Sequence, residues 1–157
     1  MTAPTRIGEE LAGFLESGLA IVMASRDGDL QADGAVAWAA RIHESREQLT
    51  LFLHEQAAAE MLPNLEKHPE MAINFDKPTL HKACQVKGRY LSSRPARADE
   101  RAIVDRQVEG FAGELVAIGI PREATAAWVT WPCVAFEMTV LQLFEQTPGP
   151  GSGEPLK

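Results

Sequence analysis

The sequence predicts a mainly β fold: a small antiparallel barrel with peripheral α-helices. Two observations lead to this prediction. Three strand-like runs, at residues 49–53, 71–76 and 83–92, follow one another with a single short helix among them. Such close spacing favours antiparallel pairing over the strand–helix alternation of a layered α/β domain. In addition, a long run at residues 133–144 alternates apolar and polar side chains and so has one apolar face.

The first helix is predicted over residues 6–17, where apolar side chains fall on one stripe. These are Ile7, Leu11, Phe14 and Leu15. Thr5 is placed to cap the start of this helix, and Gly18 is placed to end it in the left-handed conformation.

Strands are predicted next, over residues 19–25 and 35–42. A tight turn at Asp27-Gly28 follows the first strand, and a turn-rich piece at residues 32–34 precedes the second. In the second strand the residues of one parity are Val36, Trp38 and Ile42, and those of the other are Ala37, Ala39 and Arg41. The small side chains on one face leave room for either a flat ligand or a packed helix.

The middle of the chain begins with a hairpin at residues 43–48 and a strand at residues 49–53. Pro63 lies inside the next segment, and proline breaks a helix interior. We therefore expect an irregular turn through residues 56–59 and a short helix only over residues 62–67. The strands at residues 71–76 and 83–92 follow, separated by a turn.

A helix is predicted from Ala98 onward, and a short helix is predicted from Pro121 to Ala127. The stripe of the longer helix consists of Ile103, Val104, Val108 and Phe111. In the final strand, residues 133–144, the apolar parity shifts at Leu141, which indicates a β-bulge. Residues 1–144 are read as a single domain, and the Pro/Gly-rich tail, residues 145–157, is expected to lack regular structure.

Composition narrows the possible functions. The 157 residues carry a net charge of −7, with no cluster of Lys and Arg, which argues against nucleic acid and anionic membranes as partners. Cys84 and Cys133 are too few for a disulfide framework and are expected to be buried, reduced thiols. Neither a secretory signal nor an apolar run of the roughly 20 residues that span a bilayer is present, so we expect a cytoplasmic protein.

Motifs with a specific chemical mechanism are absent from the sequence. It contains no glycine-rich loop between a strand and a helix, no phosphate loop and no nucleophile elbow. Its four histidines lack the spacing of metal ligands, so no metal site is expected; they are His43, His54, His68 and His81.

Three pieces of sequence in a fixed order are similar to a known family. They are LTLFLHE at residues 49–55, NLEKHPEMAINF at residues 64–75 and QVKGRYL at residues 85–91, where Gly88 permits close packing. Their order and spacing resemble the FMN-binding split barrel of the pyridoxamine 5'-phosphate oxidase family, over residues 18–92 and in the final strand. The resemblance implies an antiparallel split β-barrel, a homodimer, and flavin mononucleotide (FMN) held at the interface between two barrels.

The resemblance also implies how the flavin phosphate would be bound, since the family uses cationic side chains for it. Val36 takes one of these positions and cannot bind a phosphate. Arg41 takes another and can bind it. The family's Ser-Arg-Lys positions fall on Ala59, Glu60 and Met61, where a carboxylate replaces a cation and opposes phosphate binding.

The positions at the flavin ring are better preserved. The residues that the resemblance places there are Ala37, Trp38, Ala39, Leu53 and His54. The family's flavin-contacting glutamine falls on Ala83, and Gln85, on the same strand face, would take its place. Each side chain also has a simpler interpretation: a core residue for Trp38, a solvated loop residue for His54, and exposed strand charges for Arg41 and Lys87.

The implied function is that of an FMN-binding oxidoreductase with an unknown substrate. No general acid or base stands out, and Arg94 and Arg97 are the only candidates for binding a substrate phosphate. The alternative is a non-enzymatic split barrel that has lost FMN, and that binds another small ligand such as haem or only dimerises. Glu60 and Met61 favour this alternative.

Overall fold

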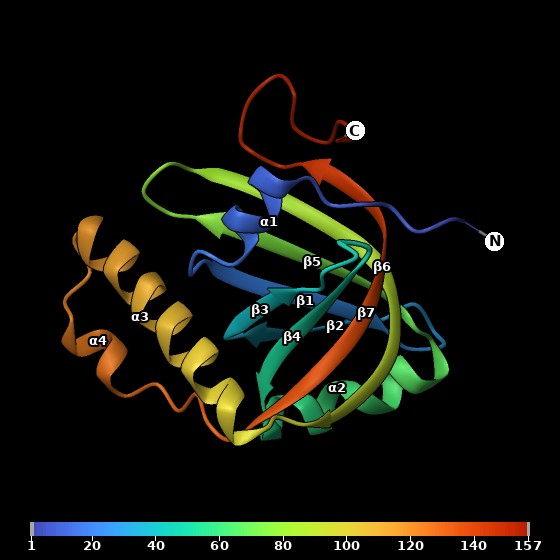
Figure 1. Cartoon of the computed structure of the whole chain (residues 1–157), viewed down its shortest axis with the longest axis horizontal. Helices are drawn as coiled ribbons and strands as arrows, with labels where there is room; N and C mark the ends of the chain where they lie inside the picture. Colours follow the sequence, from blue (N-terminus) through green and yellow to red (C-terminus); the bar gives the residue numbers. More distant parts are fainter. Residues whose placement is uncertain (1, 157) are drawn as a thin grey trace.

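The computed structural model describes residues 2–156, in which one antiparallel sheet of seven strands curves into a half-barrel (Figure 1). The strand order across the sheet is β2-β1-β5-β6-β7-β4-β3. The strands are β1 (Ala20–Arg26), β2 (Ala32–Ala37), β3 (Ala39–Ile42), β4 (Gln48–His54), β5 (Glu70–Lys77), β6 (Lys82–Pro95) and β7 (Cys133–Glu145). The predicted fold class, a mainly β split barrel with peripheral helices, is confirmed.

Helices close the half-barrel and cover part of its outside. In Figure 1, α1 (Glu9–Leu15) and α2 (Glu55–Lys67) lie at opposite ends of the barrel, and α3 (Arg101–Ala117) runs along one side beside α4 (Glu123–Ala126). A 3-10 turn, η1 (Ala98–Glu100), joins β6 to α3. The helix α1 ends at Leu15, with Glu16 as its C-cap, so it ends before Gly18; Gly18 does have the predicted left-handed conformation, with φ 84°.

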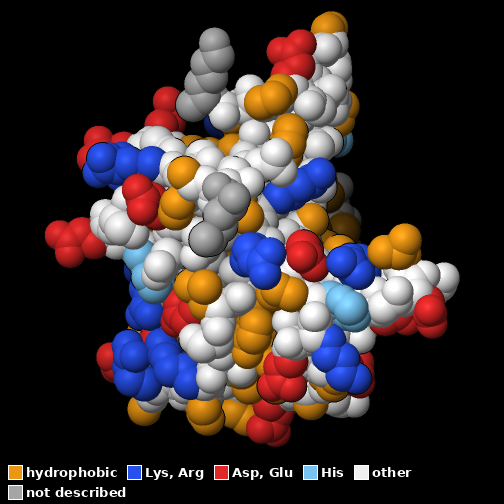
Figure 2. Space-filling model, turned by 90° about the vertical axis from the view of Figure 1, so that its right-hand side faces the viewer, with side chains coloured by type: hydrophobic (Ala, Val, Ile, Leu, Met, Phe, Trp, Pro, Cys, Tyr) orange, Lys and Arg blue, Asp and Glu red, His pale blue; other side chains and the backbone are white. Residues whose placement is uncertain are grey.

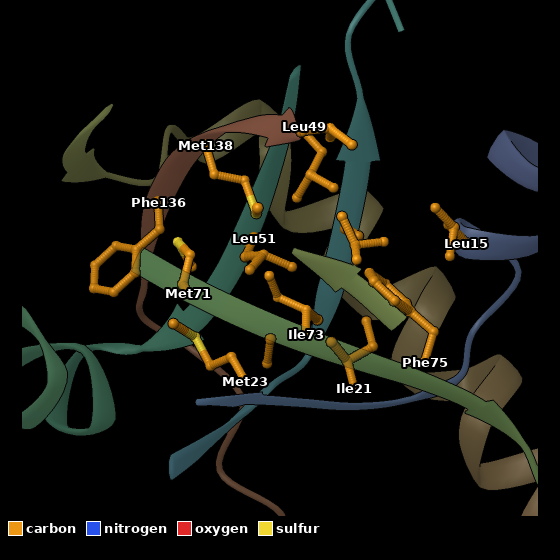
Figure 3. Close-up of a cluster of buried hydrophobic side chains, with 14 of the residues drawn as sticks. Leu15, Ile21, Met23, Leu49, Leu51, Met71, Ile73, Phe75, Phe136 and Met138 are labelled. Carbon is orange, nitrogen blue, oxygen red and sulfur yellow. The ribbon is translucent and has the colours of Figure 1, made fainter. Parts of the chain in front are cut away.

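The hydrophobic core fills the inside of the curved sheet (Figure 3). Alternate residues of each strand point inward, among them Ile73 and Phe75 of β5 and Phe136 and Met138 of β7, all fully buried. Leu15 of α1 closes one end of this core. A smaller cluster lies outside the sheet, beneath α3, and consists of Ala39, Phe52, Val104, Cys133 and Ala135.

The predicted strand at residues 35–42 is in fact two strands, and the predicted turn at residues 32–34 belongs to the first of them. β2 pairs with β1 at one edge of the sheet, and β3 pairs with β4 at the other edge. Trp38 lies between the two, and its N–H donates to the carbonyl of Phe52 at 2.8 Å. The alternation of faces is therefore broken at Trp38, so Ala37 lies in the main core and Ala39 in the outer cluster.

The prediction of an irregular turn through residues 56–59 is wrong, because α2 is continuous and contains Pro63. A proline in a helix interior costs about 3 kcal/mol. Met61 and Leu65 on the same helix are buried in the main core, at about 1.5–3 kcal/mol each. Their burial offsets the loss at Pro63 and keeps the helix intact.

The first helix is shorter than predicted, because Thr5 pairs with β7 and does not cap it. The Thr5 N–H donates to the Val140 carbonyl at 2.8 Å, and its hydroxyl donates to the Leu141 carbonyl at 2.6 Å. Gly8, in an extended conformation, precedes the helix. The segment before it is thus an extended strap along the barrel.

The predicted bulge in the final strand is confirmed at Leu141. Gly88 of β6 pairs with Val140 and Lys87 pairs with Gln142, so Leu141 has no partner in the ladder. The tail after β7 forms turns that fold back onto this strand. Leu156 N–H donates to the Leu143 carbonyl at 2.9 Å, and Glu145 N–H donates to the Glu154 carbonyl at 2.9 Å.

Candidate functional site

A hollow of about 440 Å³ opens beside the break at Trp38, between β2, the start of α2 and the segment after α4. We call it the Trp38 pocket. It is lined by Val36, Trp38, His54, Gln56, Ala57, Glu60 and Val129. Its volume lies within the range of small-molecule sites, and its lining combines apolar side chains with a few polar groups, as such sites do.

Trp38 forms an aromatic wall of this pocket. Its ring centroid lies 5.2 Å from that of Trp128, and the ring of Trp128 stacks on Phe111 of α3 at 5.4 Å with an interplanar angle of 15°. This column anchors Trp38 from the α3 side. A half-buried indole that is held in this way offers a rigid surface on which a planar ligand can pack.

His54 presents a hydrogen-bond donor at the pocket. It is the N-cap of α2, and its Nδ1 accepts from the backbone N–H of Gln56 at 3.3 Å. Because Nδ1 is an acceptor, the proton of the neutral ring lies on Nε2. The His54 ring makes no other hydrogen bond within residues 2–156, so Nε2–H is free to donate to a ligand.

The lining of the pocket is neutral to acidic. Glu60 is its one formally charged side chain within the described residues, and it is exposed. No Lys or Arg of the described chain lines the pocket. The chemistry available there is therefore an aromatic wall, a donor from His54, the amide of Gln56 and a carboxylate acceptor.

Arg41, predicted to bind phosphate, lies in a different cluster, around the buried carboxylate of Glu100. The Arg41 Nη1 is 3.0 Å from Oε1 of Glu100, whose side chain is 1% exposed. Arg94 donates from both terminal nitrogens to the two carboxylate oxygens, each at 2.8 Å. Arg97 adds its backbone N–H at 2.8 Å and its Nη2 at 3.0 Å. All three arginines that sequence reasoning proposed for phosphates thus meet at one carboxylate.

The three arginines of this cluster face three carboxylates: Glu100, Glu137 and Asp99, which lies 3.3 Å from Nε of Arg97. The hydrogen bonds from Arg94 lower the pKa of Glu100 to about 2, against the opposing effect of its burial. A second carboxylate, Glu137 of β7, lies 3.7 Å from Arg94 and accepts from the Thr50 hydroxyl at 2.8 Å. Nε2 of His43 is also 2.8 Å from Glu137. This arrangement is a structural ion network that joins β3, β4, β6 and β7 to the start of α3.

Of the five residues predicted at the flavin ring, two line the Trp38 pocket: Trp38 and His54. Leu53 is fully buried in the main core, and Ala37 is buried there too. Ala39 lies under α3, whose Gln107 side chain hydrogen-bonds both the N–H and the carbonyl of Ala40, at 3.0 and 2.7 Å. At Ala39 the small-residue face is therefore covered by a helix, which is the alternative that the sequence left open.

Gln85 lies on the outer face of the sheet, away from the pocket. A row of directly paired residues crosses the strands there, and it consists of Val36, Val22, Asn74, Gln85 and Phe144. Val36 and Gln85 are three strand spacings apart, or roughly 14 Å at about 4.8 Å per strand. Val22 and Val36 are 50% and 46% exposed, so this face carries an uncovered apolar pair next to the pocket.

Exposed cations of β1 and β6 also have partners. Glu70 lies 3.3 Å from Arg26 and 3.6 Å from Arg89, and Lys87 lies 4.9 Å from the centre of the Phe144 ring. Figure 2 shows the same mixing on one face of the molecule, where basic and acidic side chains are interspersed and hydrophobic side chains lie between them.

Sequence reasoning missed Gln56, Ala57 and Val129 as pocket residues, because the first two were assigned to an irregular turn. The helix that contains them could have been found from the apolar spacing of Ala58, Met61 and Leu65 on one face. Arg94 and Arg97 are close to Glu100 in the sequence, but Arg41 is 59 positions away, so no local signal indicates that these three arginines meet at one buried carboxylate.

Other reactive groups do not form a site in the described residues. Burial raises the pKa of the Cys84 thiol to about 11 and that of Cys133 to about 12, so neither is a nucleophile near neutral pH. Residues 2–156 contain no group of His, Cys, Asp and Glu side chains that could hold a metal ion. No helix in this part of the chain is both long and apolar enough to cross a membrane.

The chain matches no protein-family model and no curated protein. Solved structures do share its fold. A protein related to general stress protein 26, of the pyridoxinephosphate oxidase family, from Clostridium acetobutylicum is 12% identical, with a TM-score of 0.56 over 96% of each chain. HupZ from Group A Streptococcus is 13% identical, with a TM-score of 0.56 over 94% of this chain and 99% of that one.

A third similar structure is that of an F420 reductase, 15% identical, with a TM-score of 0.54 over 87% of this chain and 98% of that one. At these identities the similarity establishes the fold. It confirms the resemblance predicted from residues 18–92: the chain has the split-barrel fold found in the pyridoxamine 5'-phosphate oxidase family.

Proposed function

We propose that this protein binds a flavin by its isoalloxazine ring in the Trp38 pocket, and that it acts as a flavin-dependent oxidoreductase. The observation that carries the proposal is the pairing of an anchored indole with the Nε2–H donor of His54 in one pocket of about 440 Å³. Isoalloxazine is flat and aromatic, and its carbonyl oxygens and ring nitrogens accept hydrogen bonds. The split-barrel fold, shared with proteins of the pyridoxinephosphate oxidase family and with an F420 reductase, supports the same ligand class.

The two parts of FMN, the flavin expected from the resemblance, fit these residues differently. For the ring, Trp38 supplies a packing surface and His54 a donor. For the phosphate, the pocket supplies no cation within the described residues, and Arg41 is already paired with Glu100. When bound, a flavin supplies the electron chemistry. The contribution of this chain is to bind and orient the ring and to exclude water from one side of it.

Haem is the other ligand that the sequence suggested, and the geometry of His54 disfavours this side chain as its iron ligand in the Trp38 pocket. A histidine that binds iron through Nε2 has its proton on Nδ1, which then donates to a neighbour. Here Nδ1 accepts from the Gln56 N–H, which fixes the opposite tautomer. The remaining rival is a barrel that has lost its flavin, and the carboxylate of Glu60 in the pocket is the observation that favours it.

The direct test of the proposal is a titration with flavin, followed by the visible absorption spectrum after dialysis and by flavin fluorescence. Retained flavin absorption and quenched fluorescence are expected, because stacking on an indole quenches the flavin. A protein that retains no added flavin and leaves its fluorescence unchanged would overturn the proposal and leave the rival.

Trp38→Ala tests the position of the ring. The loss of an aromatic contact worth about 1 kcal/mol should weaken flavin binding roughly fivefold to tenfold. Trp38→Phe retains an aromatic face and serves as the matched control, with most of the affinity preserved. Equal affinities for the wild type and Trp38→Ala would place the ligand elsewhere.

We further propose a homodimer that forms through the exposed face of β2, β1 and β5. Val22 and Val36 are an uncovered apolar pair on this face and are continuous with the pocket. A second copy would cover this pair and bring a second outer face to the ligand. In this arrangement Gln85, roughly 14 Å from the pocket of its own subunit, would reach the ring bound to the other subunit.

Val22→Asp is expected to convert such a dimer to a monomer, because it buries an unpaired carboxylate in each half of a twofold interface. The dimer dissociation constant should rise about 100-fold, as about 3 kcal/mol implies. Sedimentation equilibrium at several protein concentrations measures it. Leu80→Asp is the control, since Leu80 is 63% exposed in the turn between β5 and β6. A wild-type protein that is monomeric at all concentrations would disprove the dimer.

A further inference from the structure

We infer that the Trp38 pocket selects a flavin without a phosphate over FMN. The preferred ligand class is a flavin with a neutral polyol chain, for which riboflavin is the probe. This inference rests on the proposed function, and it concerns the part of the ligand that the proposal leaves open.

The charge of the pocket lining disfavours a phosphate. A flavin phosphate brings a charge of about −1.5 to −2 at neutral pH. Glu60 lines the pocket, it is exposed, and no described residue forms an ion pair or hydrogen bond with its side chain. A phosphate there would meet an uncompensated carboxylate. The hydroxyl groups of a ribityl chain, by contrast, can donate to that carboxylate.

The ion network around Glu100 engages the cation that a phosphate would need. A phosphate would need a cation, and the one expected for it is Arg41. Arg41 lies 3.0 Å from Glu100, a buried carboxylate that Arg94 and Arg97 also contact, whereas the three arginine side chains are 31%, 32% and 53% exposed. Moving Arg41 to a ligand would remove one of the three cations that compensate the buried Glu100 carboxylate, and loss of a partner from a buried charge is unfavourable.

The start of α2 is the other place where a phosphate could bind, because helix N-termini often bind phosphates. Here the Glu55 N–H donates to the Pro132 carbonyl at 3.0 Å, and the Gln56 N–H donates to Nδ1 of His54. Two of the four free donors at this end are therefore already in use. Glu55 in the first turn also offsets the positive end of the helix dipole.

The test compares the affinities of riboflavin and FMN by flavin fluorescence at low and at moderate ionic strength. We expect riboflavin to bind about tenfold more tightly than FMN at low salt, since like charges a few ångströms apart in water account for about that factor. Added salt should narrow the difference, because it screens the repulsion on FMN and leaves riboflavin unaffected.

Glu60→Lys tests whether Glu60 causes the preference for riboflavin over FMN. This variant should bind FMN at least about tenfold more tightly than the wild type, with riboflavin affinity changed less than about twofold. The control is Glu66→Lys, which makes the same charge change on an exposed position of the same helix outside the pocket lining. It should change neither affinity by more than about twofold.

The outcomes separate this inference from the proposed function. Wild-type affinity for FMN equal to or greater than that for riboflavin overturns the inference and leaves flavin binding intact. The same holds if Glu66→Lys improves FMN binding as much as Glu60→Lys does, because the effect would then be one of net charge. If neither flavin binds to the wild type, the proposed function fails and the inference fails with it.

Discussion

Gly88→Ala should destabilise this protein by about 3 kcal/mol or more, enough to remove most of the soluble, folded material. A Cβ at this position would overlap the backbone carbonyl oxygen of Thr139 and lie 2.6 Å from Cε of Met138. Overpacking of a core usually costs about 1–3 kcal/mol when side chains can move aside. Here the obstacle is the backbone of β7, beside the bulge at Leu141, so the two longest strands would have to separate.

Urea denaturation followed by circular dichroism measures this effect, and Gly113→Ala is the matched control. Gly113 lies within α3, and a Cβ there would meet no atom within 4 Å. Alanine favours helix over glycine, so this control should stabilise the protein by about 0.5–1 kcal/mol. A Gly88→Ala protein as stable as the wild type would mean that β6 and β7 can move apart at the bulge.

The sequence was informative about the strands because their signals are local. Strand-like runs bounded by turns predicted β1, β4, β5 and β6, alternation of apolar and polar residues predicted β7, and the parity shift at Leu141 predicted the bulge. Prediction from the sequence failed where tertiary packing overrides a local rule. Pro63 predicted a broken helix, but burial of Met61 and Leu65 keeps α2 continuous. Thr5 predicted a helix cap, but its hydrogen bonds go to β7.

The candidate site was predicted in part for the same reason. Val36, Trp38, His54 and Glu60 were singled out in the sequence, and the fold brings all four to one pocket. The break at Trp38, which sends Ala37 and Ala39 into separate clusters, depends on which strands pair with β2 and β3. That pairing is a property of the closed sheet and is not contained in the alternation of residues 35–42.

The second large effect is expected from Glu100→Gln, which should destabilise the protein by about 3 kcal/mol near pH 7, as a pKa lowered from about 4.3 to about 2 implies. The glutamine side chain is similar in shape but uncharged, so three partly exposed arginines would surround a neutral, buried group. Removing one partner from a buried ion pair is costly in this way because the remaining charge is uncompensated. Asp105→Asn is the control, since the Asp105–Arg101 pair is exposed and 3.6 Å apart. It should cost less than about 0.5 kcal/mol.

The pH dependence distinguishes loss of this charge from a general packing defect. Glu100 has a pKa of about 2 in the folded protein, below the value of about 4.3 of an unfolded glutamate. A lowered folded pKa means that the carboxylate stabilises the protein fully above about pH 5, and that this contribution is lost as the pH falls from about 4.3 toward about 2.

Urea midpoints of the wild type and Glu100→Gln should therefore differ by a constant amount above about pH 5 and converge at lower pH. A difference that persists unchanged down to about pH 2 would indicate that shape, not charge, makes Glu100 important. Convergence would show that the cluster, and with it the pairing of Arg41, depends on a charged Glu100. The same carboxylate that fixes the corner between β6 and α3 would then be what keeps Arg41 from a flavin phosphate.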